Sequence, residues 1–287
     1  MIRITVIYFL AASVAMSSVF AFLLDTPHQA LKVAAFNIQT FGQTKISNST
    51  VVNNICKILQ RYDIVLLQEV RDSSDAVLKT LQTHLNVSDS WAFAASPRLG
   101  RSTTYKEQYA FFYRTKSVNI TSQYLYNDTV HDYFEREPFS AEIRYYSVAK
   151  SAFRHVVLLG LHTRPEDAFN ELRNLSAVMK VVAAHFNHHA DAVIGMGDFN
   201  ADCSYVSGAQ RRSLEIFTPS SGFSSYINDS ADTTVAHSTN CAYDRVISLG
   251  SVDLRHAQPY NFELGLNLST AAASAVSDHY PVEFALH

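Results

Sequence analysis

The chain has 287 residues, of which 47% are hydrophobic and 17% are charged, and its formal net charge is −3. This is the composition of an ordinary globular protein, long enough for one large domain or two small ones. The negative net charge excludes attraction of a polyanion by the protein's overall charge. Any contact with nucleic acid must therefore depend on a local basic patch.

Residues 1–21 differ from the rest of the chain. Arg3 is the only charge ahead of an apolar run that begins at Ile4, and Val19-Phe20-Ala21 offers small or tolerated residues at the spacing that signal peptidase requires. This pattern predicts a signal peptide over 1–21 and a secreted, extracellular mature chain, 22–287, with 22 basic and 26 acidic residues. The alternative is a membrane anchor, but no other run is long and apolar enough to span a bilayer.

Cysteines and glycosylation sequons fit this location. Three cysteines allow at most one internal disulfide and leave one thiol. Cys56 lies in an apolar helical pattern and is predicted to be buried and inert, whereas Cys203 and Cys241 lie in polar, loop-like sequence and form the natural pair. Seven N-x-Ser/Thr sequons begin at Asn48, Asn86, Asn119, Asn127, Asn174, Asn228 and Asn267.

Short apolar segments recur along the chain without an internal repeat or a Pro/Gly-rich linker. Strands are predicted at residues 31–36, 64–67, 109–113, 156–161, 193–196, 245–249 and 281–286. Helical patterns occupy residues 51–61, 76–85 and 168–185. Strands rich in branched and aromatic residues, with helices between them, predict one α/β domain in which two sheets pack face to face with helices outside.

Several of these strands end in a polar residue that can act chemically. Asn37, Glu69 and His162 each follow an apolar strand, and Asp198 and Asn200 follow another. An Asp and an Asn two positions apart point to the same side of an extended chain, where the carboxylate can bind a divalent cation and the amide can donate to a phosphate. Taken alone, each such segment could be a turn or a solvated strand edge. Strand ends that meet at one rim would instead form a site.

The complete order of these residues resembles the endonuclease/exonuclease/phosphatase superfamily. The set is Asn37, Glu69, His162, Asp198, Asn200, Asp244, Asp278 and His279. Longer runs are similar to the deoxyribonuclease I family over about residues 31–287, namely 34–42, 61–72, 105–107, 136–138, 196–205, 230–234, 240–245 and 277–283. The resemblance implies a four-layer α/β/β/α sandwich of two packed mixed sheets flanked by helices.

The same resemblance implies a divalent-metal-dependent endonuclease that hydrolyses double-stranded DNA with little sequence specificity and leaves 5′-phosphate ends. His162, paired with Glu107, and His279, paired with Asp244, would be the catalytic acid and base, because an imidazole titrates near neutral pH. Which histidine plays which part stays open. The implied Mg²⁺ or Mn²⁺ ligands are Glu69, Asp198, Asp278 and Asn37, and Asn200 would donate to the same phosphate.

Other matched positions imply DNA contacts and structural calcium. Arg71, Arg136, Tyr105 and Tyr205 resemble DNA-contacting residues of the family, and the alternative for the two tyrosines is packing in the core. One implied calcium loop contains Asp232 with the Thr and Ser residues after it. The other contains Asp132, the carbonyl of Phe134, and Glu137. Residues 127–131 lack the Cys-bridged loop found in some members, so the second calcium site is in doubt. Gln39 stands where some members carry Arg.

Two competing functions stay open at this point. Another phosphoesterase of the superfamily, acting on a sphingomyelin or an inositol phosphate, would share the metal and histidine residues. A catalytically idle binding protein could be built on the same fold. We expect a monomer without membrane association, and weak or absent inhibition by actin, because segment 93–96 carries Ala where larger side chains would give more contact.

Overall fold

The computed structural model describes residues 30–287 except 75, 188–189 and 219–220. The predicted signal peptide lies outside the described residues. In the part of the chain that the structure describes, no helix combines the length and the apolar character needed to cross a membrane.

The first sheet has six strands in the order β11-β12-β1-β2-β4-β3. In chain order they are β1 (Leu31–Phe41), β2 (Ile64–Val70), β3 (Trp91–Ala95), β4 (Gln108–Arg114), β11 (Leu254–Pro259) and β12 (Val282–Leu286). Strand β1 pairs in parallel with β2 and antiparallel with β12, so the sheet is mixed, as predicted.

The second sheet repeats this arrangement in the order β5-β6-β7-β8-β10-β9. Its strands are β5 (Val118–Leu125), β6 (Phe139–Ser147), β7 (Ala152–Gly160), β8 (Ala192–Asp198), β9 (Phe223–Ser225) and β10 (Asp244–Gly250). Strand β8 pairs in parallel with β7 and antiparallel with β10. In each sheet, the carboxyl ends of the two parallel strands therefore lie at the same side of the sheet as the start of the antiparallel strand, β12 in the first sheet and β10 in the second.

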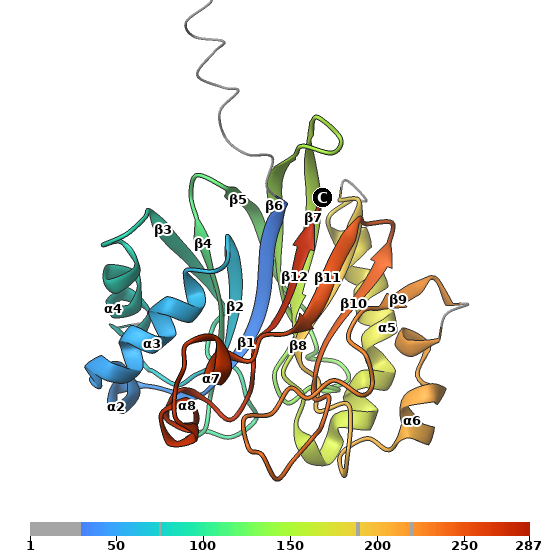
Figure 1. Ribbon diagram of the computed structural model, residues 1–287. Helices are drawn as coiled ribbons and strands as arrows, with labels where there is room; N and C mark the ends of the chain where they lie inside the picture. Colours follow the sequence, from blue (N-terminus) through green and yellow to red (C-terminus); the bar gives the residue numbers. More distant parts are fainter. Residues whose placement is uncertain (1–29, 75, 188–189, 219–220) are drawn as a thin grey trace, which may run out of the picture. The chain divides into compact units, whose positions relative to one another are not determined.

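Helices cover the outer face of each sheet (Figure 1). Those on the first sheet are α2 (Gln43–Ile46), α3 (Ser49–Leu59), α4 (Ala76–Leu85), α7 (Phe262–Gly265) and α8 (Thr270–Val276). Those on the second are α5 (Ala168–His185) and α6 (Gly208–Ser213). Three separate apolar clusters fill the spaces between the four layers. The predicted four-layer sandwich is confirmed.

The sequence of β1 explains why it lies in the centre of the core. Val33 and Ala35 point to the other sheet, whereas Ala34, Phe36 and Ile38 point to the helices, and all five are fully buried. A strand buried on both faces has a continuous apolar sequence, and this part of β1 gives Asn37, the polar residue within it, a rigid support.

Candidate active site

Asp198 lies at the end of β8 and is held there by the first sheet. Gln68 of β2 accepts a hydrogen bond from the Asp198 backbone N–H (2.9 Å) and donates one to the Leu161 carbonyl (2.7 Å). Gly197 has φ +130°, and a Cβ at this position would lie 2.5 Å from the Leu161 oxygen and 2.6 Å from the Gln68 amide. Only glycine therefore fits this crossing. The sequence indicated Gln68 only as a neighbour of Glu69. Its burial and its two hydrogen bonds show that it connects β2 to the end of β8.

The Asp198 carboxylate is the centre of the site. Its Oδ2 atom lies 3.5 Å from Nε2 of His162 and 3.5 Å from Nε2 of His279, and it accepts a hydrogen bond from Asn37 (3.1 Å). Oδ1 accepts the backbone N–H of Asn200 at 3.0 Å. Burial opposes the charge, but the imidazoles of His279 and His162 outweigh it and hold the pKa of Asp198 below its usual value.

The imidazole ring of His162 is oriented by a contact at Nδ1, the ring nitrogen that faces away from Asp198. Its Nδ1 atom lies 2.9 Å from Glu107, and its backbone N–H donates to the Tyr109 hydroxyl at 2.8 Å. Burial alone would raise the pKa of Glu107, but His162 and then Arg136 lower it to about 2. Glu107 is therefore an anion at neutral pH, and its contact with Nδ1 leaves Nε2 of His162 facing Asp198.

His279, which precedes β12, forms a second histidine–carboxylate pair. Its Nδ1 atom lies 2.8 Å from Asp244, the first residue of β10. Burial would lower the pKa of His279, but Asp244, Asp198 and then Asp278 outweigh it and raise that pKa well above the usual value. Burial also raises the pKa of Asp244. Both predicted His–carboxylate pairs are therefore formed, and their free Nε2 atoms face the same carboxylate oxygen.

Oxygen donors suited to a hard cation lie beside this pair. Glu69 has a positive φ of +58°, which turns its carboxylate out of β2 toward Asn37 (3.0 Å) and the backbone N–H of Thr40 (2.7 Å). Backbone strain of this kind often occurs at functional positions. Asp278 accepts a hydrogen bond from Gln39 at 2.8 Å, and half of its side chain is exposed. Carboxylates of this kind are the ligands that Mg²⁺ and Mn²⁺ prefer, so the residues fit a divalent ion.

Asn37, which is also an expected metal ligand, contacts two of the other expected ligands. Its Oδ1 accepts the backbone N–H of Gln39 (3.0 Å), and this fixes Nδ2 toward Glu69 and Asp198. Nδ2 therefore bridges and orients the two carboxylates, and the second lone pair of Oδ1 is the one that a cation would use. Asp198, Asp244 and His279 also present ligand atoms within 4.8 Å of one another. The sequence did not indicate that second set.

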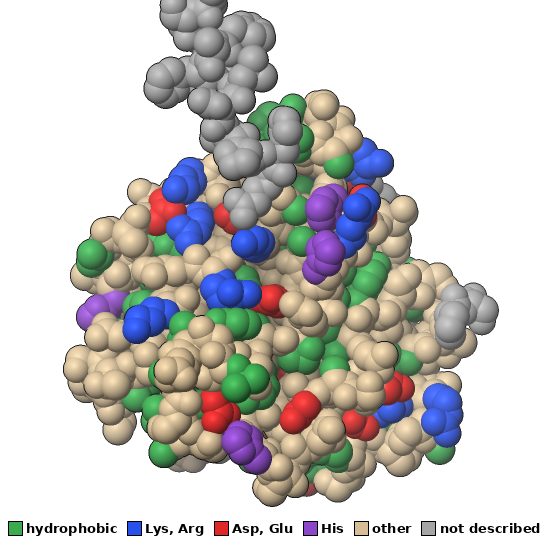
Figure 2. All heavy atoms as spheres, viewed as in Figure 1, with side chains coloured by type: hydrophobic (Ala, Val, Ile, Leu, Met, Phe, Trp, Pro, Cys, Tyr) green, Lys and Arg blue, Asp and Glu red, His purple; other side chains and the backbone are tan. Residues whose placement is uncertain are grey.

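Three of the predicted DNA-contacting side chains lie at the surface. The guanidinium of Arg71 stacks on the ring of Tyr105 at 3.9 Å, and Tyr105 is 42% exposed. Tyr205 is 40% exposed and packs against Tyr243, with ring centroids 5.2 Å apart. The alternative of core packing is therefore wrong for both tyrosines. Basic and acidic side chains are interspersed on the face drawn in Figure 2, without a continuous basic surface.

Arg136 lies inside the protein, unlike Arg71. Its guanidinium donates to the carbonyls of His162 and Thr163, both at 2.9 Å, and lies 3.6 Å from Glu107. Only 7% of the side chain is exposed. Its hydrogen bonds position the His162 backbone, a structural part that the sequence did not indicate. Asn200 is also buried and donates one amide hydrogen to Thr163 O at 3.0 Å, and its second N–H has no hydrogen-bond partner among the described residues.

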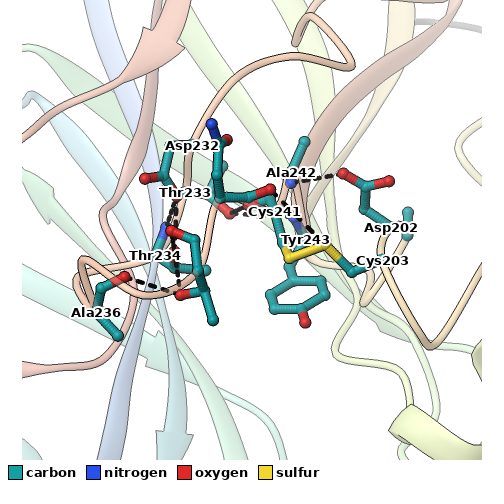
Figure 3. The surroundings of a disulfide bond; sticks show 12 residues. Asp202, Cys203, Asp232, Thr233, Thr234, Ala236, Cys241, Ala242 and Tyr243 are labelled. Carbon is teal, nitrogen blue, oxygen red and sulfur yellow. Dashed lines mark hydrogen bonds between the residues drawn. A yellow bond between two sulfur atoms is a disulfide. The ribbon is translucent and has the colours of Figure 1, made fainter.

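The loop around Asp232 lies next to the disulfide (Figure 3). Asp232 accepts hydrogen bonds from the backbone N–H (3.0 Å) and hydroxyl (2.6 Å) of Thr234. The Thr234 and Thr239 hydroxyls lie 2.8 Å apart.

The disulfide joins Cys203 to Cys241, with Cα atoms 5.9 Å apart. Cys56 is free and buried, and burial raises its pKa to about 11. The predicted disulfide and the inert thiol are confirmed.

The second predicted calcium loop has a different arrangement. Asp132 is mostly exposed and pairs with Arg101 at 3.1 Å, so a cation from the protein already faces this carboxylate. Phe134 is buried, and its backbone N–H donates to Asp128 Oδ2 at 2.8 Å. The other oxygen of Asp128 is buried and has no hydrogen-bond partner among the described residues. The sequence did not indicate Asp128, and among the described residues Glu137 forms no hydrogen bond or ion pair with this group.

Comparisons with known proteins agree with this geometry. Residues 34–279 match the model of the Endonuclease/Exonuclease/phosphatase family. Deoxyribonuclease-1 of Bos taurus and of Homo sapiens are each 43% identical over 267 residues, which cover 89% of this chain and 92% of theirs. Deoxyribonuclease-1 of Gallus gallus is 41% identical over 268 residues, with the same coverage.

Solved structures share the fold at much lower identity. A crystal structure of D. rerio TDP2 complexed with a single-strand DNA product has a TM-score of 0.60 at 16% identity and covers 90% of this chain and 98% of its own. The human Nocturnin catalytic domain has a TM-score of 0.58 at 15% identity and covers 92% and 96%.

Proposed function

The chain belongs to the Endonuclease/Exonuclease/phosphatase family and within it to the deoxyribonuclease I family, and we propose on that basis that it hydrolyses phosphodiester bonds of double-stranded DNA as a secreted, divalent-metal-dependent endonuclease. One observation carries the proposal. Nε2 of His162 and Nε2 of His279 each lie 3.5 Å from the same oxygen of Asp198, and a carboxylate holds the far nitrogen of each ring.

Two imidazoles facing one position can manage both protons of a hydrolysis. One accepts a proton from water as the water oxygen bonds to phosphorus. The other donates a proton to the O3′ atom as the P–O3′ bond breaks. The products are a 5′-phosphate and a 3′-hydroxyl. Glu107 and Asp244 hold the rings by Nδ1, so that Nε2 is the nitrogen that exchanges the proton.

The carboxylates beside the imidazoles would hold the metal ion. Glu69, Asp198 and Asp278 would supply carboxylate oxygens and Asn37 its amide oxygen, while Nδ2 of Asn37 orients Glu69 and Asp198. A bound Mg²⁺ or Mn²⁺ would neutralise negative charge on the phosphate oxygens. The free N–H of Asn200 would donate to the same phosphate.

Binding would use the exposed side chains on either side of this centre. Arg71, stacked on Tyr105, would contact a backbone phosphate, and Tyr205 would pack on sugars in the minor groove. Reading phosphates and groove shape predicts little sequence specificity. Arg136 would act through His162, which its hydrogen bonds hold in place.

Several further properties are proposed with this function. Calcium would stabilise the Asp232 loop and, through Asp132, Phe134 and Glu137, the second loop. The enzyme would be a monomer. Strand β3 is an edge strand and contains residues 93–95 of the segment predicted to contact actin. Ala94 and Ala95 offer little side-chain area for such a contact, so inhibition by actin would be weak or absent.

The test is a nicking assay on supercoiled plasmid DNA with the secreted protein. We expect relaxation with Mg²⁺ and Ca²⁺, loss of activity with a chelator, and fragments that a ligase can rejoin because they carry 5′-phosphates. Intact DNA under these conditions, together with release of phosphocholine or inorganic phosphate from a lipid or inositol phosphate, would favour another phosphoesterase. No turnover of any phosphoester would favour a binding protein.

A further inference from the structure

An exposed aromatic pair lies on the β6–β7 hairpin, at the end of the second sheet away from the candidate site. Tyr146 is 51% exposed and Phe153 is 56% exposed, and their rings contact edge to face at 5.4 Å. The guanidinium of Arg144 stacks on Phe153 at 3.8 Å. Large side chains gathered in this way on a surface usually mark a place that something covers.

The neighbouring strand has an exposed edge, and its pairing with β6 is irregular between Ile120 and Ser122. Strand β5 is the edge of the second sheet and pairs only with β6 among the described residues. Its central residues, Thr121, Ser122 and Gln123, are exposed. An exposed edge strand can pair with the edge of another molecule, and natural proteins usually block such edges with charge, proline or a covering group. Residues 118–125 contain no charge and no proline.

A glycosylation sequon lies between these two features. Asn119 begins Asn119-Ile120-Thr121, is exposed, and is the direct cross-strand partner of Arg144. Cross-strand partners share a face of the sheet, and Arg144 and Tyr146 are two positions apart on that face. No described residue forms a hydrogen bond with the Asn119 amide, so its nitrogen is free.

We propose that Asn119 carries an N-linked glycan that packs across Arg144 onto Tyr146 and Phe153 and covers the β5 edge. The transfer forms a bond between C1 of the first sugar and Nδ2. It breaks the bond from C1 to the pyrophosphate of a lipid-linked oligosaccharide donor and releases one amide proton. The apolar face of a sugar ring packs on an aromatic ring, and the polar chain beyond it keeps other strands from the edge.

The helical sequon at Asn174 is the matched contrast. Asn174 lies within α5, is half-buried, and its Nδ2 atom donates to the Asn170 carbonyl at 2.9 Å. Glycosylation would leave one N–H on this nitrogen for Asn170, and the attached sugar would then have to occupy a half-buried position against the helix. We therefore expect no glycan at Asn174. The inference rests on the proposed secretion, because transfer takes place in the secretory pathway.

The first experiment is mass-spectrometric peptide mapping of the secreted protein after enzymatic removal of glycans in ¹⁸O-water. We expect ¹⁸O-labelled Asp at position 119 and not at position 174. Occupied sequons elsewhere with an unmodified Asn119 would overturn the inference and leave secretion intact. Absence of label from all seven sequons would overturn both. Thr121→Ser keeps the sequon and should keep the glycan.

The second experiment measures association by light scattering as a function of protein concentration. Asn119→Gln should form dimers or larger species at concentrations at which the wild-type protein and Asn174→Gln are monomeric. Adding Tyr146→Ser and Phe153→Ser to Asn119→Gln should restore the monomer. If Asn119→Gln does not fold, folded wild-type protein freed of its glycans gives the same comparison. A monomeric glycan-free protein at all concentrations would contradict the covering role.

Discussion

The side chain of Asn37, where the regular pairing of β1 with β2 stops, donates a hydrogen bond of 3.1 Å to Asp198, at the end of β8. The same nitrogen donates to Glu69 at 3.0 Å. The central strands of the two sheets therefore meet through one amide, which holds two carboxylates of the proposed metal site at a fixed separation.

Replacing Asn37 by Ala should release these carboxylates from each other without removing either one. Loss of a residue that orients metal ligands typically costs about 10–100-fold in metal affinity or activity. We expect the Mg²⁺ concentration at half-maximal activity, and the Mn²⁺ dissociation constant from calorimetry, to rise by that factor. Asn53→Ala, at an exposed position of α3, is the control. Unchanged Mn²⁺ binding in Asn37→Ala would contradict the bridging role.

Replacing His162 or His279 by Ala should lower kcat by about 10²–10⁴ with little change in KM, because each group acts on protons only in the transition state. Arg71→Ala should instead raise KM and reduce the salt dependence of DNA binding. Plasmid cleavage at two salt concentrations separates the two behaviours. Near wild-type kcat in the His279 variant would refute the catalytic assignment.

Arg136→Ala should destabilise the protein, unlike Arg71→Ala. Removing Arg136 takes away one of the two cationic partners of the buried Glu107 carboxylate and two hydrogen bonds to buried carbonyls, and loss of one partner of a buried ion pair typically costs about 3–5 kcal/mol. Urea unfolding should report a loss of that size, with a fall in kcat because His162 loses its support. A stable Arg136→Ala protein with only a raised KM would favour direct DNA contact instead.

Glu171 should make stability depend on pH. Burial raises its pKa to about 7, from an ordinary value of 4.5. Between these pH values the carboxyl group of Glu171 keeps its proton in the folded protein and loses it in the unfolded chain. Its contribution to the free energy of unfolding is therefore complete below pH 4.5 and is lost as the pH rises through about 7. The total loss is up to about 3 kcal/mol. Urea unfolding measures the free energy of unfolding at pH 5 and at pH 8. We expect the difference between the two values to be smaller in Glu171→Gln than in the wild-type protein by this amount. An equal pH slope in both proteins would rule out the effect.

Replacing both Cys203 and Cys241 by Ser should lower the free energy of unfolding. The disulfide closes a loop with a sequence separation of 38, for which the chain-entropy model gives about 4 kcal/mol. Cys56→Ser, which removes the buried thiol, is the comparison variant. Peptide mapping that found Cys56 in a bridge would overturn the assignment.

The sequence by itself determined the central strands and the residues at their ends. Strands such as β1 and β8 are buried on both faces, so their composition is apolar throughout and stands out from the polar residue that follows. Strands β3, β5, β6, β9 and β11 were not predicted. Half of the residues of β5 and β11 are exposed, β3 and β9 are short, and the apolar residues of β6 alternate with polar ones, so none of these strands forms a long continuous apolar run.

Only the tertiary structure decided how each polar residue acts. Arg71 and Arg136 match the family equally well, but one stacks on Tyr105 at the surface and the other donates to buried carbonyls. Asn37 matches a ligand position, but Gln39 turns its amide nitrogen toward the carboxylates. The physical reason is common to all three: the burial and the orientation of a polar side chain depend on partners that come from other strands, and the local sequence does not contain those partners.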